Sequence, residues 1–342
     1  MIRIFGIFLH FLLLLLLSGF VLPSFAQDLP NSSEEALVWL KKIAIAPRQH
    51  NYLGTFIYYA DEHMETSSIV HIVDDKGERE KIEVLDGLQR IVIRNNDEMI
   101  CYLPESKTVV TERRWFRKFF PDILPRSFGD LNDSYFVKKG KQERVTGFDC
   151  QVIILQPRDS LRYGQKIWVD MDTGLVLKVA VMDGDQIIEQ FAFAQLKVGE
   201  GIRSELLESK YSKLATDWRT TNLMTSVLEN GALEWQVENP PAGFKKIIEM
   251  KRNLAGRPML VDHIALSDDF ATVSIFIEPI LANMAPPLSG FYSSRGAINI
   301  YVRIVDGNII TTVGEVPLET VKLIGDSVSR QEIKASTDNL KH

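Results

Sequence analysis

Apolar and polar residues alternate over much of this chain, which predicts a protein built mainly from β-strands. In residues 51–62, successive side chains fall on opposite faces of the expected strand. One face carries Tyr52, Gly54, Phe56 and Tyr58, and the other face is also mostly apolar. We therefore expect both faces to be covered, by a helix, a second sheet or a ligand. Gly54 marks a point of bending or close approach.

The strand pattern continues as an antiparallel meander joined by short turns. A helix is expected first, over residues 32–46, with Ser32 and Glu35 as a capping box and Pro47 as its end. About ten strands follow it, and a sheet of that size must curl. They are expected at 51–62, 67–73, 79–85, 90–94, 99–103, 108–111, 144–156, 166–170, 175–182 and 186–198.

Residues 113–131 interrupt this pattern with aromatic side chains, basic side chains and prolines. The prolines exclude a central strand, so a loop lying across the sheet is expected. It is either ordinary core cover or a lid over an apolar cavity. The lid interpretation predicts a lipid cavity lined by Tyr52, Phe56, Tyr58, Trp115, Phe116, Phe119, Phe120, Ile123 and Leu124. Its rim would present Arg113, Arg114, Arg117 and Lys118 to an anionic headgroup, although a solvated charged face is the alternative for each.

A second domain is expected after a polar segment of weak periodicity. The predicted boundaries are 27–207 for the large domain, 208–232 for the linker, 233–330 for a small α+β domain and 331–342 for a flexible tail. The small domain should contain strands at 245–252, 261–267, 272–278, 297–305 and 308–315. Asp306-Gly307 predicts a hairpin between the last two, and a helix is expected over 318–328.

The N-terminus predicts export. Arg3, an apolar run and small residues at Ser24 and Ala26 are typical of a signal peptide, 1–26, cut after Ala26. An uncleaved membrane anchor is the alternative, but the apolar run is short for a membrane span. In an oxidising compartment the two cysteines, Cys101 and Cys150, favour a disulfide over a reduced pair.

Charge and motifs favour binding over catalysis. The net charge is −6, from 39 Lys and Arg against 45 Asp and Glu, which argues against a nucleic-acid partner. The sequence contains no nucleophile elbow, zinc-protease motif, P-loop or dinucleotide fingerprint, so we expect no catalytic residues and no cofactor. His63 and His71 match no metal spacing, and Asp170 to Gly174 is better explained as a hairpin turn than as a calcium loop.

A series of short segments resembles the MucB/RseB family of periplasmic regulators of the envelope-stress sigma factor. No single segment is specific, but their order across the chain is. The segments are YLGTFIY (52–58), LDG (85–87), RIVIR (90–94), CYLP (101–104), RYG (162–164), Trp168, DTGLVLK (172–178), PAGF (241–244), FATVSIFIE (270–278) and VGEVP (313–317).

This resemblance implies an α+β, β-rich fold. Its large domain would be a curved, unclosed antiparallel sheet around an apolar cavity, similar to the carriers LolA and LolB. The implied activity is not enzymatic: the protein binds the periplasmic part of a membrane anti-sigma factor of the RseA or MucA type. It shields that segment from a DegS-type site-1 protease, and lipopolysaccharide or mislocalised lipoprotein releases it.

Several points stay open at this stage. We expect the partner to bind between the domains, and a homo-oligomer is a further candidate assembly. The alternative functions are a periplasmic lipid or lipoprotein carrier and, less favoured, an exported hydrolase. The extra domain from Leu233 argues against a simple carrier, which does not need one.

Overall fold

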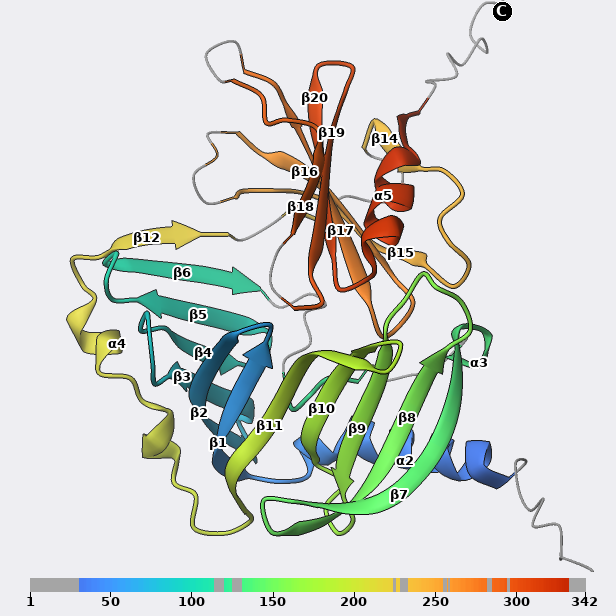
Figure 1. The fold of residues 1–342 in the computed structure, drawn as a ribbon. Helices are drawn as coiled ribbons and strands as arrows, with labels where there is room; N and C mark the ends of the chain where they lie inside the picture. Colours follow the sequence, from blue (N-terminus) through green and yellow to red (C-terminus); the bar gives the residue numbers. More distant parts are fainter. Residues whose placement is uncertain are drawn as a thin grey trace, which may run out of the picture.

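The computed structural model describes residues 31–113, 120–124, 131–223, 226–227, 233–254, 257, 259–281, 285–293 and 296–331. The predicted signal peptide and residues 332–342 of the predicted tail lie outside these ranges. The described chain forms a large N-terminal sheet and a smaller C-terminal sheet, which Figure 1 shows as two bodies in contact.

The large sheet has twelve strands and is not closed. Its neighbouring strands pair antiparallel, except β12 and β6, which are parallel. This confirms the expected large unclosed sheet, with one parallel pair added. The spatial order is β12 (Arg219–Asn222), β6 (Thr108–Arg113), β5 (Glu98–Leu103), β4 (Ile91–Asn95), β3 (Gly77–Val84), β2 (His63–Asp74), β1 (Tyr52–Ala60), β11 (Gln186–Val198), β10 (Val176–Asp183), β9 (Gly164–Asp170), β8 (Phe148–Pro157) and β7 (Tyr135–Val145).

In the part of the chain that the structure describes, the C-terminal domain combines a main sheet with one helix, as expected. The seven strands, all antiparallel, run β13 (Ser226–Val227), β15 (Lys245–Arg252), β16 (Val261–Ser267), β17 (Thr272–Pro279), β20 (Asn308–Gly314), β19 (Asn299–Val305) and β18 (Gly290–Ser293). Helix α5 (Leu318–Asp326) places Val321 and Ile324 in one buried cluster with Val273 and Ile275. A further pair, β14 (Trp235–Val237) and β21 (Val328–Arg330), completes the domain.

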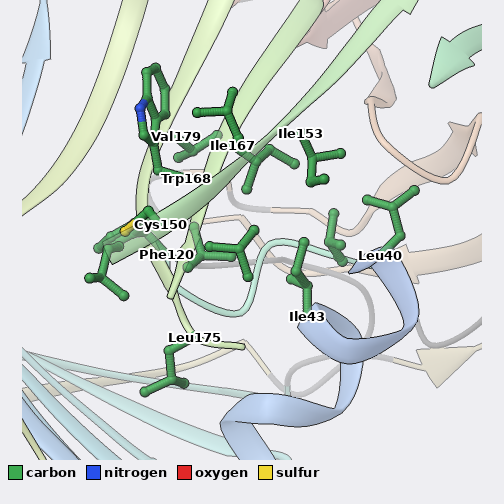
Figure 2. Close-up of a cluster of buried hydrophobic side chains, with 14 of the residues drawn as sticks. Leu40, Ile43, Phe120, Cys150, Ile153, Ile167, Trp168, Leu175 and Val179 are labelled. Atoms are coloured by element: carbon green, nitrogen blue, oxygen red, sulfur yellow. The ribbon is translucent and has the colours of Figure 1, made fainter. Parts of the chain in front are cut away.

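Helix α2 (Asn31–Ile45) covers part of the large sheet (Figure 1). Its apolar stripe places Leu40 and Ile43 in one buried cluster with Ile153 and Ile167 of β8 and β9, as Figure 2 shows. Pro47 ends the helix within the short turn η1 (Ala46–Arg48). Burial of each such side chain stabilises the fold by roughly 1.5–3 kcal/mol.

The strand expected at 144–156 is wrong, because the chain turns back within it. Thr146 and Gly147 both adopt positive φ, 43° and 94°, and form the turn between β7 and β8. The Thr146 hydroxyl donates to the carbonyl oxygen of Ala194 at 2.6 Å, which ties this turn to β11. Strand β7 therefore begins earlier, at Tyr135.

The expectation that β1 is covered on both faces is also wrong. Tyr52, Gly54 and Phe56 are buried on the inner face, whereas the outer face is half-exposed and ends in Tyr59, 47% exposed. The close approach at Gly54 is confirmed. A Cβ added there would lie 2.4 Å from the Gln195 carbonyl oxygen, where β1 and β11 shift register.

The segment expected to be a linker packs on the large sheet over much of its length. After η2 (Ser204–Leu207), α4 (Tyr211–Leu214) brings Tyr211 against Tyr102, with ring centroids 6.3 Å apart. The Trp218 ring lies tilted against Tyr211 with centroids 5.3 Å apart, and β12 then pairs with β6. The first four residues of β6, 108–111, are thus paired with the chain that leads into the second domain.

The predicted disulfide is absent, since both cysteines are free. Cys101 lies on β5 and Cys150 on β8, and seven strands separate them in the sheet. Neighbouring strands lie about 4.8 Å apart, whereas a disulfide needs Cα atoms within about 7 Å. Burial raises the pKa of Cys150 to about 11, so the thiol form is favoured.

Candidate functional site

An aromatic face lines the inner side of the large sheet. We use this name for Phe56 and Tyr58 of β1, Phe191 and Phe193 of β11, and Phe120. In the ladder between β1 and β11, Phe56 lies opposite Phe193 and Tyr58 opposite Phe191. The Tyr58 and Phe191 rings are 4.7 Å apart, and those of Phe56 and Phe193 are 6.2 Å apart. These side chains meet because strand residues two apart share a face.

Phe120 occupies the middle of this face. Its ring lies 5.6 Å from Phe191, 5.0 Å from Phe193 and 5.4 Å from Phe56. The Phe120 side chain is only 5% exposed, and Leu124 is buried in the same cluster. Residues 120–124 are the described part of the predicted lid between its two ends, Arg113 and Leu131. Phe120 and Leu124 place protein side chains against the aromatic face, where the lid interpretation places lipid.

The other predicted cavity residues divide into three groups. Ile123 is partly buried and packs against the same core. Trp115, Phe116 and Phe119 lie outside the described residues, as do Arg114, Arg117 and Lys118 of the predicted rim. Arg113 is placed only as the last residue of β6.

Tyr52 belongs to the same buried cluster as Phe56 and Phe120, but at the other end of β1 its ring also meets a buried polar network. Its ring stacks on His71 at 4.4 Å. Nδ1 of His71 lies 3.2 Å from Glu80, and Nε2 lies 2.7 Å from the Pro47 carbonyl oxygen. Burial, and then the charge of Glu80, raise the pKa of Tyr52 well above its usual value. This environment is less apolar than an acyl-chain pocket.

At the other end of the aromatic face, β11 contacts the C-terminal domain. Glu189 Oε2 accepts a hydrogen bond from the backbone N–H of Ala297 at 3.0 Å, and the Tyr58 hydroxyl lies 3.5 Å from the same oxygen. Burial raises the pKa of Glu189 to about 7, and the charges of Glu315 and Asp61 act in the same direction. The face is therefore continuous with a contact between the domains.

The main interdomain contact is built on Arg162. Its Nε lies 2.9 Å from Asp268 Oδ2, and the two side chains are 1% and 0% exposed. Nη2 of Arg162 donates to the Ala242 carbonyl oxygen at 2.6 Å, and the guanidinium lies 5.2 Å from the Phe244 ring centroid. Burial raises the pKa of Asp268, while Arg162 and the surrounding hydrogen bonds partly offset that effect. We call this contact the interdomain joint.

Three further hydrogen bonds surround the joint. Tyr135 donates to Asp268 at 3.3 Å, and Thr320 of α5 donates to the Leu161 carbonyl oxygen at 2.8 Å. The Asn299 amide lies 3.1 Å from the Tyr163 hydroxyl. Gly243, with φ +87°, lies so close to Ser134 that an added Cβ would be 2.5 Å from its hydroxyl oxygen. These contacts hold the two domains against each other in this structure.

A second ion pair connects the domains near the predicted lid. Nη2 of Arg252 on β15 donates to Glu112 Oε1 on β6 at 2.5 Å, and both side chains are largely buried. Glu112 lies next to Arg113, the last residue of β6. The strand that leads toward Phe120 therefore also contacts the C-terminal domain.

Sequence reasoning missed two parts of this site. Phe191 and Phe193 were detectable, because their spacing of two within a strand places both on one face. Arg162 and the 241–244 segment were already among the segments that carry the family resemblance. Their convergence on one joint was not readable from the sequence, because it depends on contacts between distant parts of the chain.

Other kinds of site are less supported. The described residues contain no group of three His, Cys, Asp or Glu side chains placed to hold a metal ion. None of the described helices is both long and apolar enough to cross a membrane. A cavity of about 260 Å³ lies in the C-terminal domain, away from the aromatic face, and Met259, Leu260, Pro279 and Ile309 are among its lining residues.

Comparison with family models divides the chain in the same way as the fold. The MucB/RseB N-terminal domain model matches residues 35–211, and the MucB/RseB C-terminal domain model matches residues 229–329.

Individual relatives cover both domains. The chain is 28% identical over 320 residues to the sigma factor AlgU regulatory protein MucB of Pseudomonas aeruginosa. The alignment covers 92% of this chain and 96% of MucB. It is 24% identical over 292 residues to the sigma-E factor regulatory protein RseB of Escherichia coli K12. That alignment covers 84% of this chain and 89% of RseB.

A solved structure shows the same arrangement. The Pseudomonas aeruginosa MucA/MucB complex contains a chain that matches with a TM-score of 0.67 and 26% identity, covering 87% of this chain and 99% of that one. A further crystal structure, of MucB, matches with a TM-score of 0.63.

Proposed function

Because this chain belongs to the MucB/RseB family, we propose that it is a periplasmic regulatory protein that binds the periplasmic part of a membrane anti-sigma factor. The observation that carries this proposal is similarity across both domains to MucB, which has been solved in complex with MucA. On this proposal the N-terminal residues 1–26 are a signal peptide removed after Ala26.

The interdomain joint supports a binding role that uses both domains. A partner that contacts two domains at once needs them in one relative orientation, and a preorganised orientation lowers the entropy cost of binding. The buried pair of Arg162 and Asp268 supplies such a constraint. We therefore place the anti-sigma segment along the junction of the domains.

Binding would protect the segment from proteolysis by simple competition. A site-1 protease must hold its substrate in an extended conformation, and a segment bound to this protein is withheld from it. The cleavage rate then follows the unbound fraction of the anti-sigma factor. This makes the protein a negative regulator of the stress response without any catalytic step of its own.

The aromatic face is the proposed sensor for lipopolysaccharide or mislocalised lipoprotein. An acyl chain gains about 0.8 kcal/mol per buried methylene group, so a few methylenes suffice to compete with a single packed side chain. Phe120 and Leu124 occupy the inner face of the sheet, so we propose that a chain displaces them. The unplaced residues Trp115, Phe116 and Phe119 would join this lining, with Arg113, Arg114, Arg117 and Lys118 toward the headgroup.

The alternative is a carrier that passes lipid between membranes. The aromatic face is compatible with both functions. The regulator is favoured by the second domain and its buried joint with the first, which a carrier does not require.

Isothermal titration calorimetry of the mature chain tests the binding proposal. The titrant is the periplasmic segment of the anti-sigma factor from the same organism. We expect binding at micromolar concentration or tighter, and weaker binding after lipopolysaccharide is added. Transfer of a bound fatty acid to acceptor vesicles, without any binding of the segment, would instead support the carrier.

A further inference from the structure

The aromatic face and the C-terminal domain share one side chain, Tyr58. Its ring packs on Phe191 with centroids 4.7 Å apart, and its hydroxyl lies 3.5 Å from Glu189 Oε2. Glu189 and Phe191 are two residues apart on β11, so their side chains lie on the same face of the sheet. One end of Tyr58 therefore belongs to the proposed lipid site and the other end to the interdomain contact.

The C-terminal domain is fitted closely against this position by its turn at Gly296 and Ala297. The N–H of Ala297 donates to Glu189 at 3.0 Å, and the N–H of Gly296 donates to Asp61 Oδ2 at 3.2 Å. Ala297 is fully buried. Gly296 has φ +63°, and a Cβ there would lie 2.5 Å from Glu189 Oε2 and 3.3 Å from the Tyr58 hydroxyl. The turn leaves no spare room around these two side chains.

We propose that Tyr58 and Glu189 couple the aromatic face to the C-terminal domain, so that an acyl chain entering the face releases the 296–297 turn. This inference rests on the lipid-sensing part of the proposed function and adds the contact that would report occupancy to the second domain.

The coupling follows from the stiffness of the tyrosine side chain. An acyl chain can enter only if Phe120 leaves and the rings of Phe191 and Tyr58 repack around the chain. Because the phenol ring is rigid, its hydroxyl moves with it, away from Glu189. The turn at Gly296 and Ala297 then loses its close packing against Tyr58 and Glu189. Coupling of this kind is reciprocal, so docking of the turn must weaken acyl binding by the same factor.

Amide hydrogen exchange tests the coupling directly. The full mature chain is measured with and without myristate, used below its critical micelle concentration, and myristate binding is measured separately by calorimetry. We expect the exchange rate of the Ala297 amide to rise at least tenfold at saturation. The amide of Ile275, within the sheet of the same domain, is the internal control and should not change.

Two variants separate coupling from general loosening. Gly296→Ala disturbs the turn and approaches the aromatic face only at the Tyr58 hydroxyl, leaving the Phe56, Phe120, Phe191 and Phe193 rings untouched. Reciprocity then predicts about fivefold tighter myristate binding. Tyr58→Phe keeps the ring but removes the hydroxyl, so Ala297 should exchange faster without lipid and respond less to it. Tyr59→Phe is the matched control, because Tyr59 points to the outer face and should behave as the natural protein.

The possible failures are distinguishable. If myristate binds but the exchange of Ala297 is unchanged, the coupling is wrong and the lipid-sensing proposal survives. If myristate does not bind the natural protein or any variant, both are wrong.

Discussion

Arg162 and Asp268 form a buried ion pair between the two domains, with Nε and Oδ2 2.9 Å apart and almost no exposure of either side chain. A buried pair of this kind is not strongly stabilising in itself, because both charges lose their hydration. It does make the joint sensitive to the loss of either partner.

Arg162→Ala should destabilise the protein by about 3–5 kcal/mol, because it leaves the Asp268 carboxylate buried without its cation. Urea unfolding measures the change. Arg144→Ala is the control, since Arg144 pairs with Asp149 on the surface, and it should cost less than about 1 kcal/mol. Equal, small effects of both substitutions would show that the joint does not depend on the pair.

Phe120→Ala should change stability and lipid binding in opposite directions, lowering the free energy of unfolding while strengthening myristate binding. Removing a buried phenylalanine ring costs about 3–5 kcal/mol in unfolding free energy. The vacated face should bind myristate more tightly, because the chain no longer competes with the ring. Phe136→Ala removes a partly exposed ring from β7 and should change neither quantity much. Loss of stability with unchanged or weaker myristate binding would mean that Phe120 is ordinary core.

Thiol labelling tests the position of the two cysteines. Both are free, so the unreduced, denatured protein should take up two alkylating groups by mass spectrometry. In the native protein Cys150 should react far more slowly than Cys101, because it is buried and its pKa is raised to about 11. If the unreduced, denatured protein takes up no alkylating groups, the two cysteines are joined in a disulfide and the thiol assignment is wrong.

Because Glu189 lies at the interdomain contact, its titration should make the free energy of unfolding depend on pH. Its pKa is raised to about 7 by burial, so folding favours the protonated form. The contribution of protonated Glu189 to the free energy of unfolding is fully present below the ordinary carboxyl pKa near 4.5. It is lost as the pH rises through 7. A shift of this size corresponds to at most about 3 kcal/mol.

Glu189→Gln removes this titration while keeping the shape of the side chain. The variant should gain stability relative to the natural protein between pH 5 and pH 8 in urea unfolding. Asp268 titrates within the same interface, so the ¹³C chemical shift of the Glu189 carboxyl provides the residue-specific reading. A stability difference that is the same at both pH values would contradict the assignment.

The strand pattern predicted much of the fold, for local reasons. Alternation placed Phe56 and Tyr58 on one face, and Asp306-Gly307 is the hairpin turn between β19 and β20. The turn at Thr146-Gly147 was missed because the apolar residues beyond Phe148 continue the strand pattern without an evident break. Burial of only one face of β1 could not be read from composition, since its outer residues are equally apolar.

The site was less predictable, because its parts meet through the tertiary fold. Cys101 and Cys150 both lie in strands, but their distance depends on the order of strands in the sheet. The contact of Arg162 with Asp268 joins two domains in the same way. Family resemblance indicated which segments matter, and the structure shows that two of them, 162–164 and 241–244, meet at the joint.

Protection of the anti-sigma factor from cleavage is the most direct test of the proposed regulation. The rate of site-1 cleavage of the periplasmic segment is measured with purified protease, with and without a saturating amount of the mature chain. The proposed function predicts at least tenfold slower cleavage in its presence, and recovery of the rate when lipopolysaccharide is added. Equal rates with and without the chain would contradict it.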